Sequence, residues 1–213
     1  MSENDMRATG FVLPVGNGGV GKTSLARVLL EFSRDQDRYE ALIETKVTKN
    51  LEFEFVPIPW EENGKHFRVM AQILVPPGQK IMKKKQQGRS YEQVIDIYRF
   101  HIRRVDVVLL VYSILQEDSW RDIHYWVKEV SDLVHDHTQY ILLGTHLDSV
   151  EQRTVIWEDI ARERRELMTL LREVEPSWEG SCELLEVSNR TGQNIDRLRE
   201  LLAEGILKAG QYI

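Results

Sequence analysis

The residues from Gly16 to Ser24 form the clearest chemical pattern in the chain. They read Gly-Asn-Gly-Gly-Val-Gly-Lys-Thr-Ser and contain the G-x-x-x-x-G-K-[ST] spacing of a phosphate-binding loop. Backbone N–H groups of such a loop surround a di- or triphosphate at a helix N-terminus, where the helix dipole also favours negative charge. Lys22 would reach the β- and γ-phosphates, and the Thr23 hydroxyl would bind Mg²⁺. The candidate binding residues here are Gly16, Asn17, Gly18, Gly19, Val20, Gly21, Lys22, Thr23 and Ser24.

The segments on either side of this loop are those that a phosphate site needs. An apolar run at 10–15 predicts a strand before the loop. After the loop, Leu25, Val28, Leu29 and Phe32 lie at helical spacing. A glycine-rich turn without a ligand is the alternative interpretation, and the strand–loop–helix order disfavours it. The sequence therefore predicts that the chain binds a nucleotide.

The rest of the chain alternates predicted strands and helices. Alternating apolar residues at 51–58 and 66–75 flank Asn63-Gly64, which predicts an antiparallel hairpin. Apolar runs at 107–111 and 140–143 are typical of buried parallel strands, and 184–187 predicts a shorter last strand. Helical periodicity marks the segments 120–134, 160–171 and 195–206. The expected fold class is α/β, with a six-stranded, mostly parallel sheet, one antiparallel hairpin and helices on both faces.

Composition narrows the classes of protein that this chain can belong to. Its 213 residues are most simply one domain, and the net charge of −6 argues against a general nucleic-acid binder. Cys182 is the single cysteine, which fits a reducing cytoplasm. We find no apolar run of membrane-spanning length, no signal-peptide pattern and no lipidation motif. We therefore expect a cytoplasmic protein without an intrinsic membrane anchor.

Three further motifs follow the predicted strands in a fixed order. Val75-Pro76-Pro77-Gly78-Gln79 ends the third strand, Thr145-His146-Leu147-Asp148 ends the fifth, and Ser188-Asn189-Arg190 follows the sixth. Together with the phosphate loop, they resemble the motifs of Ras-like small GTPases over nearly the whole chain. The resemblance implies a single G domain over 1–213, with an extended switch-II segment at about 80–104. It also implies that GTP or GDP and Mg²⁺ bind, with effector and GTPase-activating proteins as partners.

The same resemblance assigns roles to individual residues. The Gly78 N–H would sense the γ-phosphate, and Gln79 would orient the attacking water. Asp148 would accept the two guanine N–H donors that adenine lacks. The loop of Ser188, Asn189 and Arg190 would offer a backbone N–H to guanine O6, while Thr145 and His146 complete the base site. The alternatives are a turn or helix cap for Asp148 and an ordinary turn residue for Ser188.

Within the superfamily, the chain is most similar to the bacterial MglA-type polarity GTPases. The run 51–57 resembles the second strand of that group, as does Pro77-Gly78-Gln79. That group carries a switch-I threonine just before this strand and an arginine finger before the threonine. Here Asn50 and Lys49 align with those positions, and Thr48 precedes them. Thr48 is the candidate second Mg²⁺ ligand, Lys49 a candidate catalytic cation, and a roadblock-type activating protein the implied partner.

Departures from the family pattern keep a second function open. Val75 stands where the family has the acid that holds the Mg²⁺ water shell, and His146 replaces the lysine that packs over the base. Glu54 is an alternative Mg²⁺ ligand or a solvated strand carboxylate. The leading hypothesis is a slow GTPase switch, which is a monomer or part of a partner-dependent complex. The alternatives are a hydrolysis-deficient, GTPase-like scaffold and, less favoured, a P-loop ATPase.

Two other charged segments have no assigned chemistry. Lys80, Lys83, Lys84, Lys85 and Arg89 form a basic stretch before an amphipathic helical pattern at 91–102. This stretch is either a switch-II surface for an acidic partner or anionic lipid, or a solvated loop. His135 and His137 flank Asp136, and we interpret them as loop histidines.

Overall fold

The computed structural model describes residues 5–32, 52–76, 96 and 104–213. Several predicted features lie outside these ranges: the switch-I candidates Thr48 and Lys49, the Gly78-Gln79 pair, and the basic stretch with nearly all of the helical pattern at 91–102. Their predicted roles stay predictions. The phosphate loop and the two base-recognition motifs are described in full.

The described residues build one six-stranded sheet with the order β2-β3-β1-β4-β5-β6. β2 and β3 pair antiparallel, and the other neighbouring strands are parallel. Asn63, at φ 51°, and Gly64, at φ 72°, make the tight turn between β2 and β3, so the predicted hairpin is confirmed. The strands are β1 (Asp5–Val15), β2 (Glu52–Glu62), β3 (Lys65–Val75), β4 (Val107–Ser113), β5 (Gln139–Thr145) and β6 (Cys182–Glu186).

Helices cover both faces of the sheet and bury two separate apolar cores. α1 (Lys22–Phe32) and α6 (Ile195–Ala209) pack on one face, where Leu29 and Leu202 are fully buried. α4 (Ile123–Glu129) and α5 (Trp157–Val174) pack on the other face, around the buried Trp126. α3 (Glu117–Arg121) precedes α4, and a 3₁₀ helix, η2 (Leu147–Gln152), follows β5. The predicted α/β class, with helices on both faces, is confirmed.

The helix predicted over 120–134 differs from the observed structure. The segment is broken at Asp122, at φ −82° and ψ 0°, and α4 ends at Glu129. An Asp side chain favours such breaks because its carboxylate competes for local hydrogen bonds. Here the Asp122 carboxylate accepts a hydrogen bond from Asn17 in the phosphate loop. The break therefore brings a polar anchor to the candidate site, a feature that apolar periodicity does not reveal.

The first strand is longer than predicted and contains a proline. It begins at Asp5 and pairs with β3 from its first residue, although the apolar run begins only at position 10. The backbone N–H and carbonyl of Phe11 both point toward β4. The N–H donates to the Asp106 carboxylate, and the carbonyl accepts the Asp106 N–H. Residues alternate sides along a strand, so Pro14 faces β3, where the pairing ends at Val12. The missing N–H of Pro14 therefore costs no ladder bond.

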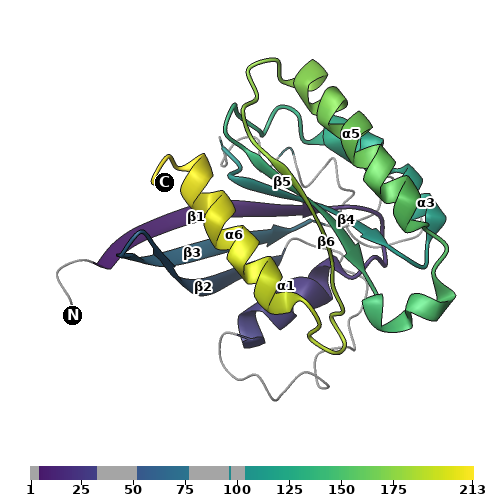
Figure 1. The fold of residues 1–213 in the computed structure, drawn as a ribbon, viewed down its shortest axis with the longest axis horizontal. Helices are drawn as coiled ribbons and strands as arrows, with labels where there is room; N and C mark the ends of the chain where they lie inside the picture. The colour runs from purple at the N-terminus through teal and green to yellow at the C-terminus, as the bar shows by residue number, and fades with distance from the viewer. Residues whose placement is uncertain (1–4, 33–51, 77–95, 97–103) are drawn as a thin grey trace.

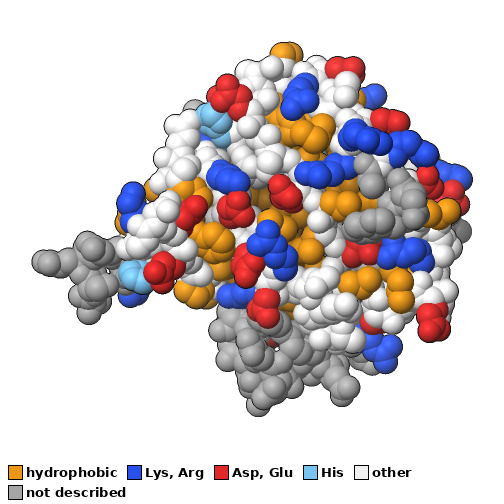
Figure 2. Space-filling view, in the orientation of Figure 1, with side chains coloured by type: hydrophobic (Ala, Val, Ile, Leu, Met, Phe, Trp, Pro, Cys, Tyr) orange, Lys and Arg blue, Asp and Glu red, His pale blue; other side chains and the backbone are white. Residues whose placement is uncertain are grey.

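The surface over α5 and α6 carries mixed charge. Figure 2 shows acidic and basic side chains interspersed with apolar ones on this face. Among the described residues, no helix is long and apolar enough to cross a membrane.

Candidate functional site

The predicted motifs meet at one edge of the sheet. The phosphate loop follows β1, Thr145 ends β5, and Ser188 comes two residues after β6. These are the carboxyl ends of parallel strands, the edge at which open α/β sheets bind ligands. β3 also ends at this edge, and Gly78 and Gln79, which follow it in the sequence, lie outside the described residues.

The phosphate loop has a backbone that only glycine accommodates easily. Gly19 and Gly21 have φ values of 82° and 92°, and a Cβ on Gly16 would lie 2.1 Å from the Val111 carbonyl oxygen. Within the described part of the chain, no acceptor takes the N–H groups of residues 18–21. A loop with successive unpaired N–H groups at a helix N-terminus is suited to bind an anion.

Lys22 is held across this loop by backbone oxygens. Its Nζ donates to the Gly16 and Asn17 carbonyls, at 2.8 Å each, and the residue is only 6% exposed. Burial lowers the pKa of Lys22 to about 7, because the charged form loses hydration. A phosphate beside the ammonium would favour its charged form. The lysine ammonium thus lies across the phosphate loop, where the motif requires it.

The Asn17 side chain anchors the loop from outside. Its Oδ1 accepts a hydrogen bond from Trp126 Nε1 at 2.9 Å, and its Nδ2 donates to Asp122 Oδ2 at 2.7 Å. Both partners belong to the broken α3–α4 segment. The Asn17 amide therefore positions the backbone, and only its main chain remains for a ligand. The sequence analysis missed this anchor because the segment 120–134 shows only helical periodicity, which does not indicate the hydrogen bond of Trp126 to Asn17.

Asp148 and Ser188 form a pair on the base side of the site. Ser188 Oγ donates to Asp148 Oδ1 at 2.6 Å, so the Asp148 carboxylate is oriented from the loop after β6. Ser188 Oγ also accepts the backbone N–H groups of Arg190 and Thr191, at 3.2 and 3.0 Å. The Ser188 N–H donates to the Gln193 carbonyl, which closes the loop on itself. These bonds give both side chains defined positions.

Two residues at the end of β5 connect the base side to the phosphate loop. The Thr145 hydroxyl is buried and lies 2.8 Å from the Val20 carbonyl oxygen. His146 has a left-handed backbone, at φ 68°, and its Nδ1 lies 2.9 Å from Ser113 Oγ and 3.0 Å from Thr145 Oγ1. Burial lowers the pKa of His146, so the neutral ring is favoured.

Asn189 makes the second connection. Its Nδ2 donates to the Gly21 carbonyl at 3.1 Å. The sequence placed Asn189 in the site only through its backbone, because the corresponding family residue is a small one. The polar side chain at that position is the signal that was overlooked. Arg190 is exposed, and its backbone N–H is already bound within the loop.

The residues available to Mg²⁺ are few. Thr23 lies in the first turn of α1 and is 8% exposed, while Val75 is fully buried at the end of β3 and offers no ligand. Glu54 points to the same side of β2 as Glu52, which pairs with Arg27 of α1 at 3.3 Å. The described residues contain no cluster of three or more His, Cys, Asp or Glu able to hold a metal. The donor set therefore fits Mg²⁺ held mainly by nucleotide phosphates and a hydroxyl.

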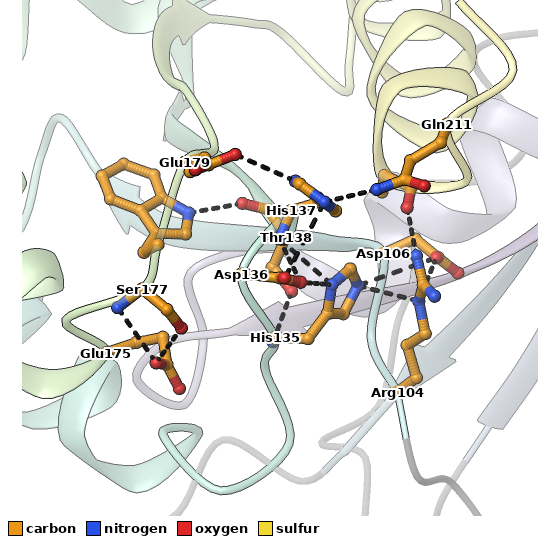
Figure 3. Close-up of polar contacts among 12 residues, drawn as sticks. Arg104, Asp106, His135, Asp136, His137, Thr138, Glu175, Ser177, Glu179 and Gln211 are labelled. Atoms are coloured by element: carbon orange, nitrogen blue, oxygen red, sulfur yellow. Dashed lines mark hydrogen bonds and ion pairs between the residues drawn. The ribbon is translucent and has the colours of Figure 1, made fainter.

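A second polar cluster lies at the opposite edge of the sheet (Figure 3). The Asp106 carboxylate is 8% exposed and accepts the Phe11 N–H at 2.8 Å, and burial raises its pKa. Arg104 Nε lies 3.0 Å from His135 Nε2, and His135 Nδ1 lies 3.2 Å from Asp136 Oδ1. Burial lowers the pKa of His135.

The C-terminal segment closes this second cluster. Arg104 also binds the Ala209 carbonyl at the end of α6, and the Gln211 amide donates to His137 (Figure 3). His135 and His137 lie in the loop before β5, as the sequence predicted. Their hydrogen bonds connect the loop before β5 to Arg104 and to the C-terminal segment, which indicates a structural role.

Comparison with known proteins identifies related sequences. Residues 88–208 match the model of the Ras family. The chain is 25% identical to Ras-related protein Rab-26 of Mus musculus over 185 residues, which cover 87% of this chain and 58% of that protein. It is 26% identical to Ras-related protein RABD2a of Arabidopsis thaliana over 147 residues, 69% of this chain and 61% of the relative.

A third relative is covered over most of its length. Ras-related protein Rab-10 of Diplobatis ommata is 26% identical over 200 residues, which cover 92% of this chain and 80% of that protein. The chain thus spans less than two thirds of the length of the mouse and plant relatives, and 80% of the length of the Diplobatis ommata relative.

Proposed function

This chain belongs to the Ras family, and we propose that it is a guanine-nucleotide-binding switch that hydrolyses GTP slowly. One observation carries the proposal. A phosphate loop whose N–H groups at residues 18–21 have no acceptor within the described part of the chain lies at the same sheet edge as an oriented Asp148–Ser188 pair. Thr145 links the two through the Val20 carbonyl.

In this proposal, each part of the site recognises one part of the nucleotide. The N–H groups of residues 18–21 bind the β- and γ-phosphates, and Lys22 neutralises their charge. Asp148 accepts the guanine N1–H and N2–H donors, and the backbone N–H of Asn189 donates to O6. Among the described residues, no acceptor takes that N–H, whereas Ser188, Arg190 and Thr191 use theirs within the loop.

Hydrolysis would depend on residues beyond the described ranges. Gln79 orients the attacking water, and the Lys49 cation or a partner's cation offsets the developing charge. Thr23 and Thr48 are the proposed Mg²⁺ ligands, and the ion would supply charge neutralisation for the phosphates. Lys49 lacks the planar fork of arginine, so we expect slow turnover without an activating protein.

The wider biological setting is also a proposal. We place residues 1–213 in a single G domain with an extended switch-II segment at 80–104. It would act in the cytoplasm, as a monomer or in a partner-dependent complex, through effector and GTPase-activating proteins. The similarity to MglA-type GTPases makes a roadblock-type activator the first partner to test.

Gln79→Ala tests hydrolysis separately from binding. We expect a lower single-turnover rate of GTP cleavage with an unchanged GDP dissociation constant, because Gln79 acts on water rather than on the nucleotide. Gln86→Ala, a few residues further along the same segment, is the matched control. Equal cleavage rates in wild type and Gln79→Ala would refute the role of Gln79.

A hydrolysis-deficient scaffold is the second candidate function. Val75 favours it, since this buried aliphatic residue cannot hold a metal-bound water. A scaffold would bind GTP with little dependence on Mg²⁺ and would show no cleavage even at saturating partner concentrations. A P-loop ATPase is the weakest alternative, because it leaves Asp148 and Ser188 without a role.

A further inference from the structure

Asn189 is the one residue of the loop after β6 whose side chain reaches the phosphate loop. Its Nδ2 donates to the Gly21 carbonyl at 3.1 Å, between residues 168 positions apart in the sequence. A Cβ on Gly21 would lie 3.0 Å from the same Nδ2, so a larger residue there would push the Asn189 amide aside. The asparagine amide therefore packs directly against bare backbone.

The phosphate loop itself does not depend on this bond. The Gly21 carbonyl also accepts the Leu25 N–H at 2.9 Å, which is the first hydrogen bond of α1. Lys22 and Asn17 hold the earlier part of the loop by separate contacts. Loss of the Asn189 amide would thus leave the phosphate loop supported and would free the loop after β6.

The hydrogen bond of Asn189 is made at a cost. Its Oδ1 is buried and has no donor among the described residues. An unpaired buried acceptor is unfavourable and needs an explanation beyond packing. The position of Nδ2 supplies one, because it fixes the residue to the phosphate loop.

The backbone of Asn189 carries the N–H that the rest of the loop leaves unused. The two polar groups of Asn189 therefore serve different parts of the site. Its side-chain amide contacts the phosphate loop, and its backbone N–H is available to a base. Thr145 makes a parallel link to the preceding carbonyl, that of Val20. Two successive carbonyls of the phosphate loop are therefore bound by side chains from the base side.

We propose that Asn189 is a positioning residue that sets the spacing between the base-recognition loop and the phosphate loop. The inference rests on the proposed guanine-nucleotide site. It states that base and phosphate binding are coupled through the Asn189 amide. Ligands that fill both halves of the site should depend on Asn189, whereas a ligand that fills only the phosphate half should not.

Asn189→Ala tests this coupling with two probes. GDP fills both halves, and inorganic pyrophosphate fills only the phosphate half. We expect dissociation of fluorescent GDP to be about five- to tenfold faster, the equivalent of one net hydrogen bond. The affinity for pyrophosphate should change less than about twofold on the same scale. The preference for GDP over ADP should fall with the GDP affinity.

Two further variants keep the test interpretable. Gln193→Ala removes an exposed side chain from the same loop and should leave all constants unchanged. Asn189→Asp keeps the shape but removes the donor, so it should weaken GDP binding at least as much as Asn189→Ala. Urea unfolding of each nucleotide-free variant shows whether it is folded.

The outcomes separate the two proposals. Tight GDP binding by wild type, with equal binding by both Asn189 variants, overturns the positioning role alone. Parallel losses of pyrophosphate and GDP affinity also overturn it, since Asn189 would then only support the phosphate loop. Failure of wild type to bind GDP overturns the proposed function and, with it, this inference.

Discussion

The two edges of the sheet hold polar clusters that differ in how their hydrogen bonds are used. At the carboxyl edge, the N–H groups of residues 18–21 have no acceptor among the described residues, and Lys22 has only backbone oxygens around its charge. At the amino edge, the Asp106 carboxylate accepts a hydrogen bond from the Phe11 N–H, and its Oδ1 lies 3.4 Å from Arg104 Nε. There, His135 and His137 bind Arg104, Asp136 and Gln211.

This difference separates a binding site from a structural network. Gly18 and Gly19 are exposed, so backbone N–H groups of the phosphate loop are accessible to an anion at the N-terminus of α1. A closed network uses its hydrogen bonds to hold segments together. Buried ionisable groups with shifted pKa values occur at both edges, so such shifts alone do not identify the site.

Lys22→Ala should give the largest loss of GDP affinity. A small loss would contradict the difference between the two edges. Removal of the ammonium takes a charge-assisted contact from the phosphates, and we expect GDP affinity to fall at least about 100-fold. The free energy of unfolding of the nucleotide-free protein should not fall, because burial of Lys22 is itself unfavourable. Calorimetric titration and urea unfolding measure the two quantities.

Lys208→Ala is the control for this change. Lys208 pairs with Glu204 on the exposed surface of α6, away from the carboxyl edge. It should alter neither quantity appreciably. Equal GDP binding by wild type and Lys22→Ala would remove the phosphate loop from the site.

Asp106→Ala should show the opposite behaviour at the other edge. The change leaves the partly buried Phe11 N–H without its carboxylate acceptor, and we expect a loss of about 1–3 kcal/mol in the free energy of unfolding. GDP affinity, measured on the folded protein, should stay the same. Asp136→Ala, an exposed carboxylate of the same cluster, should cost less. A large loss of GDP affinity in Asp106→Ala would show that the two edges are coupled.

Two histidines sharpen the comparison through pH. Burial lowers the pKa of both His135 and His146 below the ordinary value of about 6.5. As pH falls below this value, the unfolded chain binds protons before the folded one, so stability should decrease. His135→Gln and His146→Gln should each make this decrease shallower.

Nucleotide binding distinguishes the same two variants. Only His146→Gln should change the pH dependence of GDP affinity between pH 7.5 and 5.5, because His146 adjoins Thr145 at the site. An equal change in His135→Gln would contradict the separation of the two edges.

Proton uptake is the smallest effect that we expect. With a pKa of about 7, Lys22 is partly neutral at pH 7, and bound phosphates favour its charged form. GDP binding at pH 7 should therefore take up about half a proton. Titrations in two buffers of different ionisation enthalpy measure this number, and Lys22→Arg should abolish the uptake. No uptake in wild type would mean that Lys22 is already charged in the free protein.

The sequence predicted the fold well because its signals are local. The Asn63-Gly64 turn and the apolar runs of β4 and β5 require no knowledge of distant contacts. The start of β1 was missed, since Met6 and Arg7 are exposed and held by backbone pairing with β3. The break at Asp122 was missed because the Asp122 carboxylate contacts Asn17, which lies 105 residues away in the sequence.

The candidate site likewise contains residues that local motifs predict and contacts that only the folded structure reveals. A motif fixes the spacing of backbone groups, so residues 16–24 and the Asp148–Ser188 pair were found from the sequence and stay predictions as binding residues. The anchors of Asn17 and Asn189 are tertiary contacts with no short-range pattern. The resemblance gave both positions only a backbone role, and the structure adds their side chains.

The most direct test is calorimetric titration of nucleotide-free protein with GDP, GTP and ATP, first with Mg²⁺ and then with EDTA. The account predicts tight binding of GDP and GTP, no comparable binding of ATP, and weaker guanine-nucleotide binding in EDTA. Binding of GTP that is unchanged in EDTA would favour the scaffold over the switch. Equal binding of ATP and GTP, or no nucleotide binding at all, would contradict the claim that the carboxyl edge of the sheet is a guanine-nucleotide site.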